Sequence, residues 1–173
     1  ANDFSALTPS TVGELLTVVL RNAVGVDRTL QLSAAVFALT PVQSWRIVQS
    51  ASSINSRLMG YVFVKDMISQ VEPGLSNVMA SFRNAGIQEL VIDLRYNGGG
   101  MTSVALHLGG LIGGVRTKGE VFTKFSHNDK NKSKDTTDRF EDPAKALDLP
   151  RLTVITTDGS ASASEAVING LEP

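Results

Sequence analysis

The feature that most constrains the fold is a buried strand that passes through a short serine-rich turn directly into a helix. Residues 152–155 form an apolar β-type run, residues 156–165 read TTDGSASASE, and a helical apolar pattern begins at Ala166. A serine at such a junction can present a reactive hydroxyl, and the unpaired N–H groups of the helix can hold an oxyanion. The alternative is that Asp158-Gly159 is an ordinary turn and that one serine caps the helix.

A second segment with the same order of elements lies upstream. Residues 89–94 have the pattern of a buried strand, the sequence RYNGGG follows at 95–100, and a helical pattern begins at Met101. Three glycines after a buried strand allow the backbone to approach another group closely. The segment is not a phosphate-binding P-loop, because no Gly-Lys-Ser/Thr follows, and it lacks the Gly-x-Gly-x-x-Gly spacing of dinucleotide sites.

Taken together, ELVIDLRYNGGG and LTVITTDGSASASEAV resemble the carboxy-terminal processing serine peptidases, also called tail-specific proteases. The resemblance covers residues 58–173 well and the first forty residues loosely. It implies a Ser–Lys dyad enzyme with a PDZ domain inserted near the catalytic core. It assigns the nucleophile to Ser162, one oxyanion donor to the backbone of Gly98 or Gly99, and the other to the N–H of Ala163.

The general base that this family would use is absent from the chain. In the family it is a lysine in a Gly-Lys turn beyond the nucleophile, a known variant of the catalytic triad. The sequence ends at Pro173, and none of its lysines sits in a matching motif. We therefore expect the chain to be a fragment of a protease, inactive by itself, whose catalytic lysine lies outside it.

Several polar residues near the two turns have structural alternatives. Ser160 and Ser164 are rivals of Ser162, with Ser160 expected to cap the helix and Ser164 expected in its first turn. Glu165 is expected to be structural, because a carboxylate in the first turn is stabilised by the helix dipole. Asp93 and Arg95 flank the glycine turn and are expected to fix that loop rather than to perform chemistry.

The two histidines offer a weaker alternative for the base. His107 falls among leucines on a predicted helix and is expected to be packed or half-exposed, whereas His127 lies in a polar stretch. A Ser–His arrangement through either residue is the alternative to the Ser–Lys pair. The pair lacks the His-Glu-x-x-His pattern, so we expect no metal site and no cofactor.

The composition limits the classes of molecule that the chain is expected to bind. The formal net charge is −1 with a pI near 6.1, which gives no electrostatic footprint for nucleic acid. Cysteine is absent, which excludes disulfides and cysteine-based zinc sites. The most apolar helical run, residues 104–115, is too short to span a bilayer. The expected partner is a protein or peptide substrate, the oligomeric state is left open, and the resemblance implies an exported, periplasmic or cell-envelope location.

The first forty residues predict a small separate lobe. Residues 8–23 fit a helix that begins at Thr8-Pro9, with Thr11 and Glu14 at capping-box spacing and a stripe of apolar residues on one face. Residues 29–39 then predict a strand. A helix followed by a strand resembles the second half of a PDZ domain, so residues 1–40 are interpreted as a partial PDZ-like domain.

Residues 41–173 are interpreted as the serine peptidase core. Strands are expected at 44–49, 59–64, 89–94, 120–125 and 151–157, and helices at 68–85 and 101–112. Residues 126–142 predict a long solvated loop, or alternatively a substrate-binding lip. Strands that alternate with helices indicate an α/β fold with a parallel sheet, and the resemblance narrows this to a crotonase-like ββα superhelical core.

The function that follows is that of a serine endopeptidase that cleaves proteins near exposed C-terminal segments by acyl transfer. The alternative is a non-catalytic module on the same fold that binds a peptide or a small apolar ligand.

Overall fold

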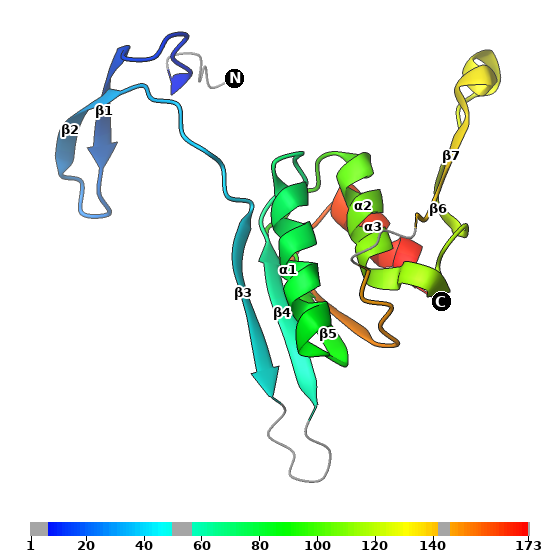
Figure 1. Cartoon of the computed structure of the whole chain (residues 1–173). Helices are drawn as coiled ribbons and strands as arrows, with labels where there is room; N and C mark the ends of the chain where they lie inside the picture. Colours follow the sequence, from blue (N-terminus) through cyan, green and yellow to red (C-terminus); the bar gives the residue numbers. More distant parts are fainter. Residues whose placement is uncertain (1–6, 50–56, 142–145, 173) are drawn as a thin grey trace. The chain divides into compact units, whose positions relative to one another are not determined.

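The computed structural model describes residues 7–49, 57–141 and 146–172 of the chain. The chain divides into two compact units, Ala1–Leu39 and Thr40–Pro173 (Figure 1).

The first unit is built around a β-hairpin. Strands β1 (Leu15–Arg21) and β2 (Asp27–Ser33) pair antiparallel. The side-chain oxygen of Asn22 accepts hydrogen bonds from the N–H groups of Val24 (3.1 Å) and Val26 (2.9 Å), which closes the turn between the strands. An ion pair of 2.6 Å between Arg21 and Asp27 joins the strand ends next to this turn.

The helix predicted over residues 8–23 is wrong. The apolar spacing fits a helix, but Thr17, Val18 and Val19 are β-branched and the asparagine turn that follows favours a hairpin. The capping-box residues form an isolated turn instead, in which the Glu14 carboxylate accepts the N–H of Ser10 at 3.0 Å. The PDZ-like interpretation of this unit relied on that helix and stays a prediction without its support.

The second unit contains a four-stranded sheet with the order β3-β4-β5-β8. Strand β3 (Val42–Gln49) pairs antiparallel with β4 (Leu58–Val64), whereas β5 (Glu89–Asp93) pairs parallel with both β4 and β8 (Leu152–Ile155). The predicted α/β fold is therefore confirmed, although the sheet is not purely parallel because β3 runs antiparallel to β4. The crotonase-like superhelical detail stays a prediction.

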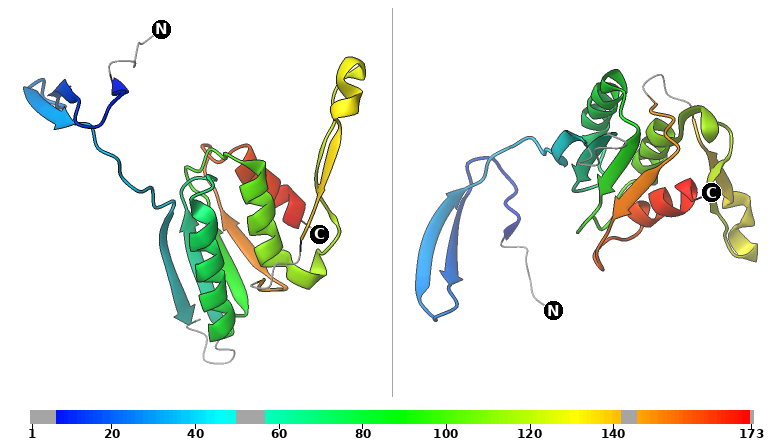
Figure 2. Two further views of the ribbon diagram at one scale, coloured as in Figure 1. Left: turned by 45° about the horizontal axis from the view of Figure 1, so that its top comes forward. Right: turned by 90° about the horizontal axis from the view of Figure 1, so that it is seen from below.

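Two helices, α1 (Val71–Ala85) and α2 (Thr102–Gly113), cover one face of this sheet (Figures 1 and 2). The apolar stripe of α1 is buried and includes Leu75, Val78, Met79 and Phe82. Full burial of a side chain such as Phe82 contributes about 1.5–3 kcal/mol. Gly60 in β4 permits this packing, because a Cβ built there would lie 2.8 Å from Ile87 and 2.9 Å from Phe82.

A β-hairpin lies between α2 and β8, and the sequence analysis predicted only part of it. After the short 3₁₀ helix η2 (Gly114–Arg116), strand β6 (Val121–Phe125) pairs antiparallel with β7 (Thr136–Arg139), and the 3₁₀ helix η3 (Asp129–Lys134) joins them. The solvated loop predicted for 126–142 is thus partly wrong. The four polar residues of β7 carry no apolar alternation that would reveal a strand, and the hairpin is anchored by buried Phe140, whose ring lies 5.1 Å from that of Phe122.

The last helix, α3 (Ala163–Leu171), follows β8 and packs against α2 and β6. Among the helices in the described ranges, none combines the length and the apolar character that crossing a bilayer requires.

Candidate active site

Ser162 lies at the junction between the last strand and the last helix. Strand β8 ends at Ile155, residues 156–162 form a loop, and α3 begins at Ala163. Ser162 is exposed and has φ 55° and ψ −117°, a conformation that is costly for a residue with a Cβ. Strained backbone of this kind is found where a strand-to-helix turn presents a catalytic serine.

The glycine turn that follows β5 lies directly against this serine. A Cβ built on Gly99 would stand 2.7 Å from the Ser162 Cβ and 2.8 Å from the Ala163 nitrogen. Gly99 also has φ 98°, which favours glycine for a second reason. By contrast, a Cβ on Gly98 would meet nothing closer than the Gly159 carbonyl oxygen at 3.9 Å. The structure therefore brings the residues predicted from both turns together.

Three backbone amides of the two turns differ in their hydrogen bonds. Ala163 is the first residue of α3 and is buried, and its N–H has no hydrogen-bond partner within the described ranges. The same holds for the N–H of Gly98 among the described residues. The N–H of Gly99 donates to the side-chain oxygen of Asn97 at 2.9 Å.

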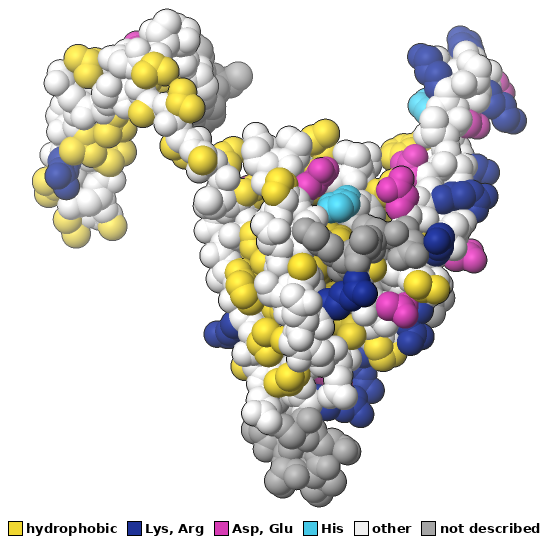
Figure 3. Space-filling model, in the orientation of Figure 1, with side chains coloured by type: hydrophobic (Ala, Val, Ile, Leu, Met, Phe, Trp, Pro, Cys, Tyr) yellow, Lys and Arg dark blue, Asp and Glu magenta, His cyan; other side chains and the backbone are white. Residues whose placement is uncertain are grey.

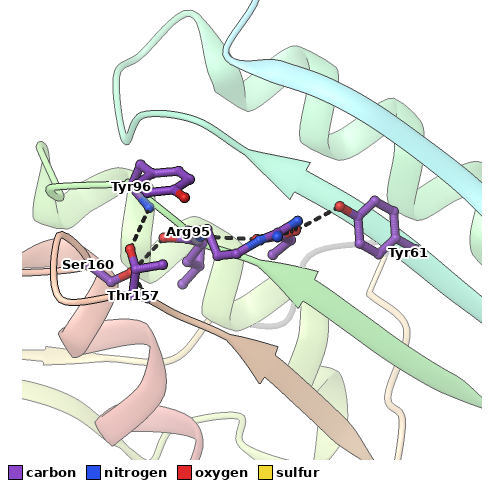
Figure 4. Close-up of polar contacts among 7 residues, drawn as sticks. Tyr61, Arg95, Tyr96, Thr157 and Ser160 are labelled. Atoms are coloured by element: carbon purple, nitrogen blue, oxygen red, sulfur yellow. Dashed lines mark hydrogen bonds and ion pairs between the residues drawn. The ribbon is translucent and has the colours of Figure 1, made fainter.

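The three serines of the turn have different environments. The Ser160 hydroxyl donates to the Leu94 carbonyl at 2.7 Å and accepts the N–H of Thr157 at 3.0 Å (Figure 4). The Ser164 hydroxyl is buried and donates to the Asn97 carbonyl at 2.9 Å. The prediction that Ser160 caps the helix is wrong, because Ser162 occupies the N-cap while Ser160 joins the two loops.

Glu165 stabilises the start of the helix. Its carboxylate accepts the N–H of Ser162 at 2.7 Å and lies in the first turn of α3, where negative charge is favourable. This contact agrees with the structural role expected for Glu165, and it fixes the backbone of the candidate nucleophile.

An ion pair at the end of β5 holds the base of the glycine turn. The guanidinium of Arg95 contacts the fully buried carboxylate of Asp93 at 2.6 Å, and the Tyr61 hydroxyl donates to the same carboxylate at 2.7 Å (Figure 4). The hydrogen bond from Arg95 holds the pKa of Asp93 below its usual value, although burial opposes this shift. Burial, followed by the contact with Asp93, raises the pKa of Tyr61.

Tyr96 belongs to the segment of the glycine turn and Lys65 contacts it, and sequence reasoning gave neither residue a role there. Tyr96 has φ 63° and is 67% exposed, and its N–H donates to the Thr157 hydroxyl at 3.0 Å. The ammonium of Lys65 donates to the Tyr96 carbonyl at 3.4 Å. No sequence motif marks Lys65, since it reaches the turn only because β4 and β5 are neighbours.

Neither histidine is hydrogen-bonded to Ser162. His107 Nε2 lies 3.1 Å from the Ser76 hydroxyl and lines a pocket of about 200 Å³ together with Ser103 and Glu141. His127 Nδ1 lies 3.3 Å from the Asp135 carboxylate at the β6–β7 hairpin. Within the described ranges, no group of three or more His, Asp or Glu side chains has an arrangement suited to a metal ion.

The strained serine before a helix and the backbone amides beside it form an arrangement that a hydrolase could use for a nucleophile and its oxyanion donors. The chain belongs to Peptidase family S41, a family of serine peptidases whose profile matches residues 58–172. The carboxy-terminal processing peptidase resemblance seen in the sequence is thereby confirmed. No curated protein sequence matches the chain.

Solved structures share the fold. A putative S41 protease from Bacteroides fragilis has a TM-score of 0.69 and 22% identity, over 90% of this chain and 43% of its own. The photosystem II D1 C-terminal processing protease has a TM-score of 0.59 and 23% identity, over 92% of this chain and 41% of its own. A putative peptidase from Parabacteroides merdae has a TM-score of 0.51 and 16% identity, over 75% and 42%. The chain thus spans less than half the length of these proteins.

Proposed function

We propose that the chain is the nucleophile-bearing segment of a serine endopeptidase that cleaves proteins near exposed C-terminal segments. The observation that carries the proposal is the contact between strained Ser162 and the backbone of Gly99, with the open N–H of Ala163 beside it. Acyl transfer requires a nucleophile and oxyanion donors around one reacting carbon, and this juxtaposition supplies both.

In the proposed reaction the Ser162 Oγ attacks the carbonyl carbon of the scissile peptide bond, and the carbonyl oxygen becomes an oxyanion. The N–H of Ala163 and the N–H of Gly98 or Gly99 hold that oxyanion. The hydroxyl proton passes to a lysine amine and then to the leaving nitrogen as the C–N bond breaks. A water molecule attacks the resulting ester in the same way, which releases the new C-terminal carboxylate and restores the serine.

The lysine is proposed to lie in the part of the protease outside this chain, as the family resemblance implies. Lys65 is the alternative within the chain, because it contacts the Tyr96 carbonyl beside the glycine turn. The substrate is proposed to be an unfolded or extended protein segment, and the location is proposed to be outside the cytoplasm. Both follow from the family and from the D1 C-terminal processing protease among the similar structures.

The test compares the full-length protein, its Ser162→Ala variant and residues 1–173 on an unfolded protein substrate, with cleavage sites read by mass spectrometry. We expect cleavage toward the C-terminus by the full-length protein alone. Removal of a member of a catalytic unit costs several orders of magnitude in rate, since the members act together. A full-length protein that binds the substrate but leaves it intact would replace this proposal with the non-catalytic binding module.

A further inference from the structure

Asn97 is fully buried in the glycine turn, and each of its polar groups is hydrogen-bonded. Its backbone N–H donates to the Leu94 carbonyl at 3.0 Å, and its side-chain Nδ2 donates to the Val64 carbonyl at 3.0 Å. Its side-chain oxygen accepts the N–H of Gly99 at 2.9 Å. A buried amide without these partners would be destabilising, so the bonds hold the side chain in one orientation.

The backbone carbonyl of Asn97 reaches the other loop. It accepts the N–H of Ala161 at 3.2 Å and the hydroxyl of buried Ser164 at 2.9 Å. Ala161 precedes Ser162 by one residue and Ser164 follows it by two. Asn97 therefore forms hydrogen bonds with the end of β4, with the glycine turn and with residues on both sides of the candidate nucleophile.

We propose that Asn97 is a positioning residue that holds the glycine turn against Ser162, and that the Ser164 hydroxyl is its partner on the nucleophile loop. This inference rests on the proposed function. Asparagine suits the position because its amide carries a donor and an acceptor at a fixed separation. An aspartate of the same shape keeps the acceptor for Gly99 but turns a carboxylate oxygen toward the Val64 carbonyl.

The first test is kinetic and uses the full-length protein. In Asn97→Asp we expect kcat to fall about 10- to 100-fold with KM within about threefold, because misplacement of a reacting group by about 1 Å can cost a hundredfold in rate. Ser164→Ala should lower kcat less, by about 3- to 10-fold, because Ala161 still bonds the carbonyl. Acidification should raise the activity of Asn97→Asp relative to the wild type, since a protonated carboxyl regains one O–H donor.

A matched control separates positioning from general destabilisation. Ile92→Val removes one buried methyl group from the adjacent strand β5 and removes no hydrogen bond. Rates are compared per folded molecule, with the folded fraction taken from circular dichroism. We expect Ile92→Val to keep kcat within about twofold of the wild type. A kcat for Asn97→Asp within threefold of the wild type, or an equal loss in Ile92→Val, would overturn the inference.

A second measurement does not depend on catalysis. Hydrogen exchange of the Gly99 and Ala161 amides should be at least about tenfold faster in Asn97→Asp than in the wild type. The introduced carboxylate is repelled by the Val64 carbonyl, which displaces the turn that carries the acceptors of both amides. Unchanged exchange at both amides would also overturn the inference. If the wild type and Ser162→Ala are equally inert toward substrate, the proposed function fails, and the exchange rates still decide whether Asn97 holds the two loops together.

Discussion

Gly99 and Ser162 lie so close together that no side chain fits between them: a Cβ on the glycine would stand 2.7 Å from the serine Cβ. Gly98, which precedes Gly99, has no such close contact: a Cβ built on it would meet nothing nearer than 3.9 Å, and Gly98 is not among the residues with positive φ. The two positions therefore differ in what a substitution would do, although they are adjacent and identical in sequence.

We expect Gly99→Ala to lower kcat/KM of the full-length protein by about a hundredfold or more, because the methyl group would push Ser162 and Ala163 out of place. Gly98→Ala should stay within about threefold of the wild type, because its methyl group would make an ordinary van der Waals contact, 3.9 Å from the Gly159 carbonyl oxygen. Cleavage of an unfolded protein substrate measures both, with circular dichroism as the check on folding. Comparable losses in the two variants would contradict this reading of the turn.

Gly98→Pro serves as a further comparison, because proline removes the backbone N–H. Loss of activity in a folded Gly98→Pro protein would assign the glycine-turn oxyanion donor to Gly98. Retained activity would assign it to Gly99, whose N–H would then be shared between Asn97 and the oxyanion.

The strained backbone of Ser162 predicts an unusual order of stabilities. Ser162→Gly removes the Cβ that makes the positive φ of this residue costly, whereas Ser162→Ala keeps the Cβ and its strain. Both variants lose the hydroxyl. We expect Ser162→Gly to be more stable than Ser162→Ala by about 1 kcal/mol. Urea unfolding followed by circular dichroism measures the difference. Equal midpoints would mean that the turn stores no strain at this residue.

The ion pair below the glycine turn predicts a pH dependence of stability. Because Arg95 lowers the pKa of Asp93, the pair contributes stability above the usual carboxyl pKa near 3.8 and loses it as the pH falls through the lower folded-state pKa. Arg95→Met should therefore unfold at a lower urea concentration than the wild type at pH 7. The difference in urea midpoint between Arg95→Met and the wild type should become smaller as the pH drops below about 4. Tyr61→Phe keeps the ion pair, so its urea midpoint at pH 7 should differ less from that of the wild type than the midpoint of Arg95→Met does.

Among the described residues, no histidine or lysine is hydrogen-bonded to Ser162. We therefore expect three of these residues to tolerate substitution without loss of activity. His107→Ala, His127→Ala and Lys65→Met should each keep full-length activity within about threefold, because the two histidines pair with Ser76 and Asp135 and Lys65 with Tyr96. Residues 1–173 alone should be inactive. A hundredfold loss in one of these variants, with folding intact, would identify that residue as the base.

The sequence predicted the elements whose signal is local. The stripe of α1 and the strands β4, β5 and β8 have a clear apolar pattern, and α1 ends at Gly86, whose left-handed conformation favours glycine. The hairpin of residues 15–33 was missed because the same spacing of apolar residues fits a helix and a strand. Strand β7 was missed because its residues are polar and its partner β6 supplies the pairing.

At the candidate site, the sequence identified the two turns but not the contacts between them. The roles of Ser160 and Asn97 depend on hydrogen bonds between residues more than sixty positions apart. Spacing along the chain carries no information on such contacts, and the three serines of the turn differ only in the backbone conformation that tertiary structure imposes.

Strands β5 and β8 are neighbours in the sheet, although the β6–β7 hairpin lies between them in sequence. The two loops that meet at Ser162 thus come from adjacent strand ends, and nothing inserted between α2 and β8 has to pass between them. Evolution can lengthen, shorten or replace that hairpin while the geometry around the serine is inherited unchanged. The β6–β7 hairpin and the backbone around Ser162 are therefore free to change at different rates within one fold.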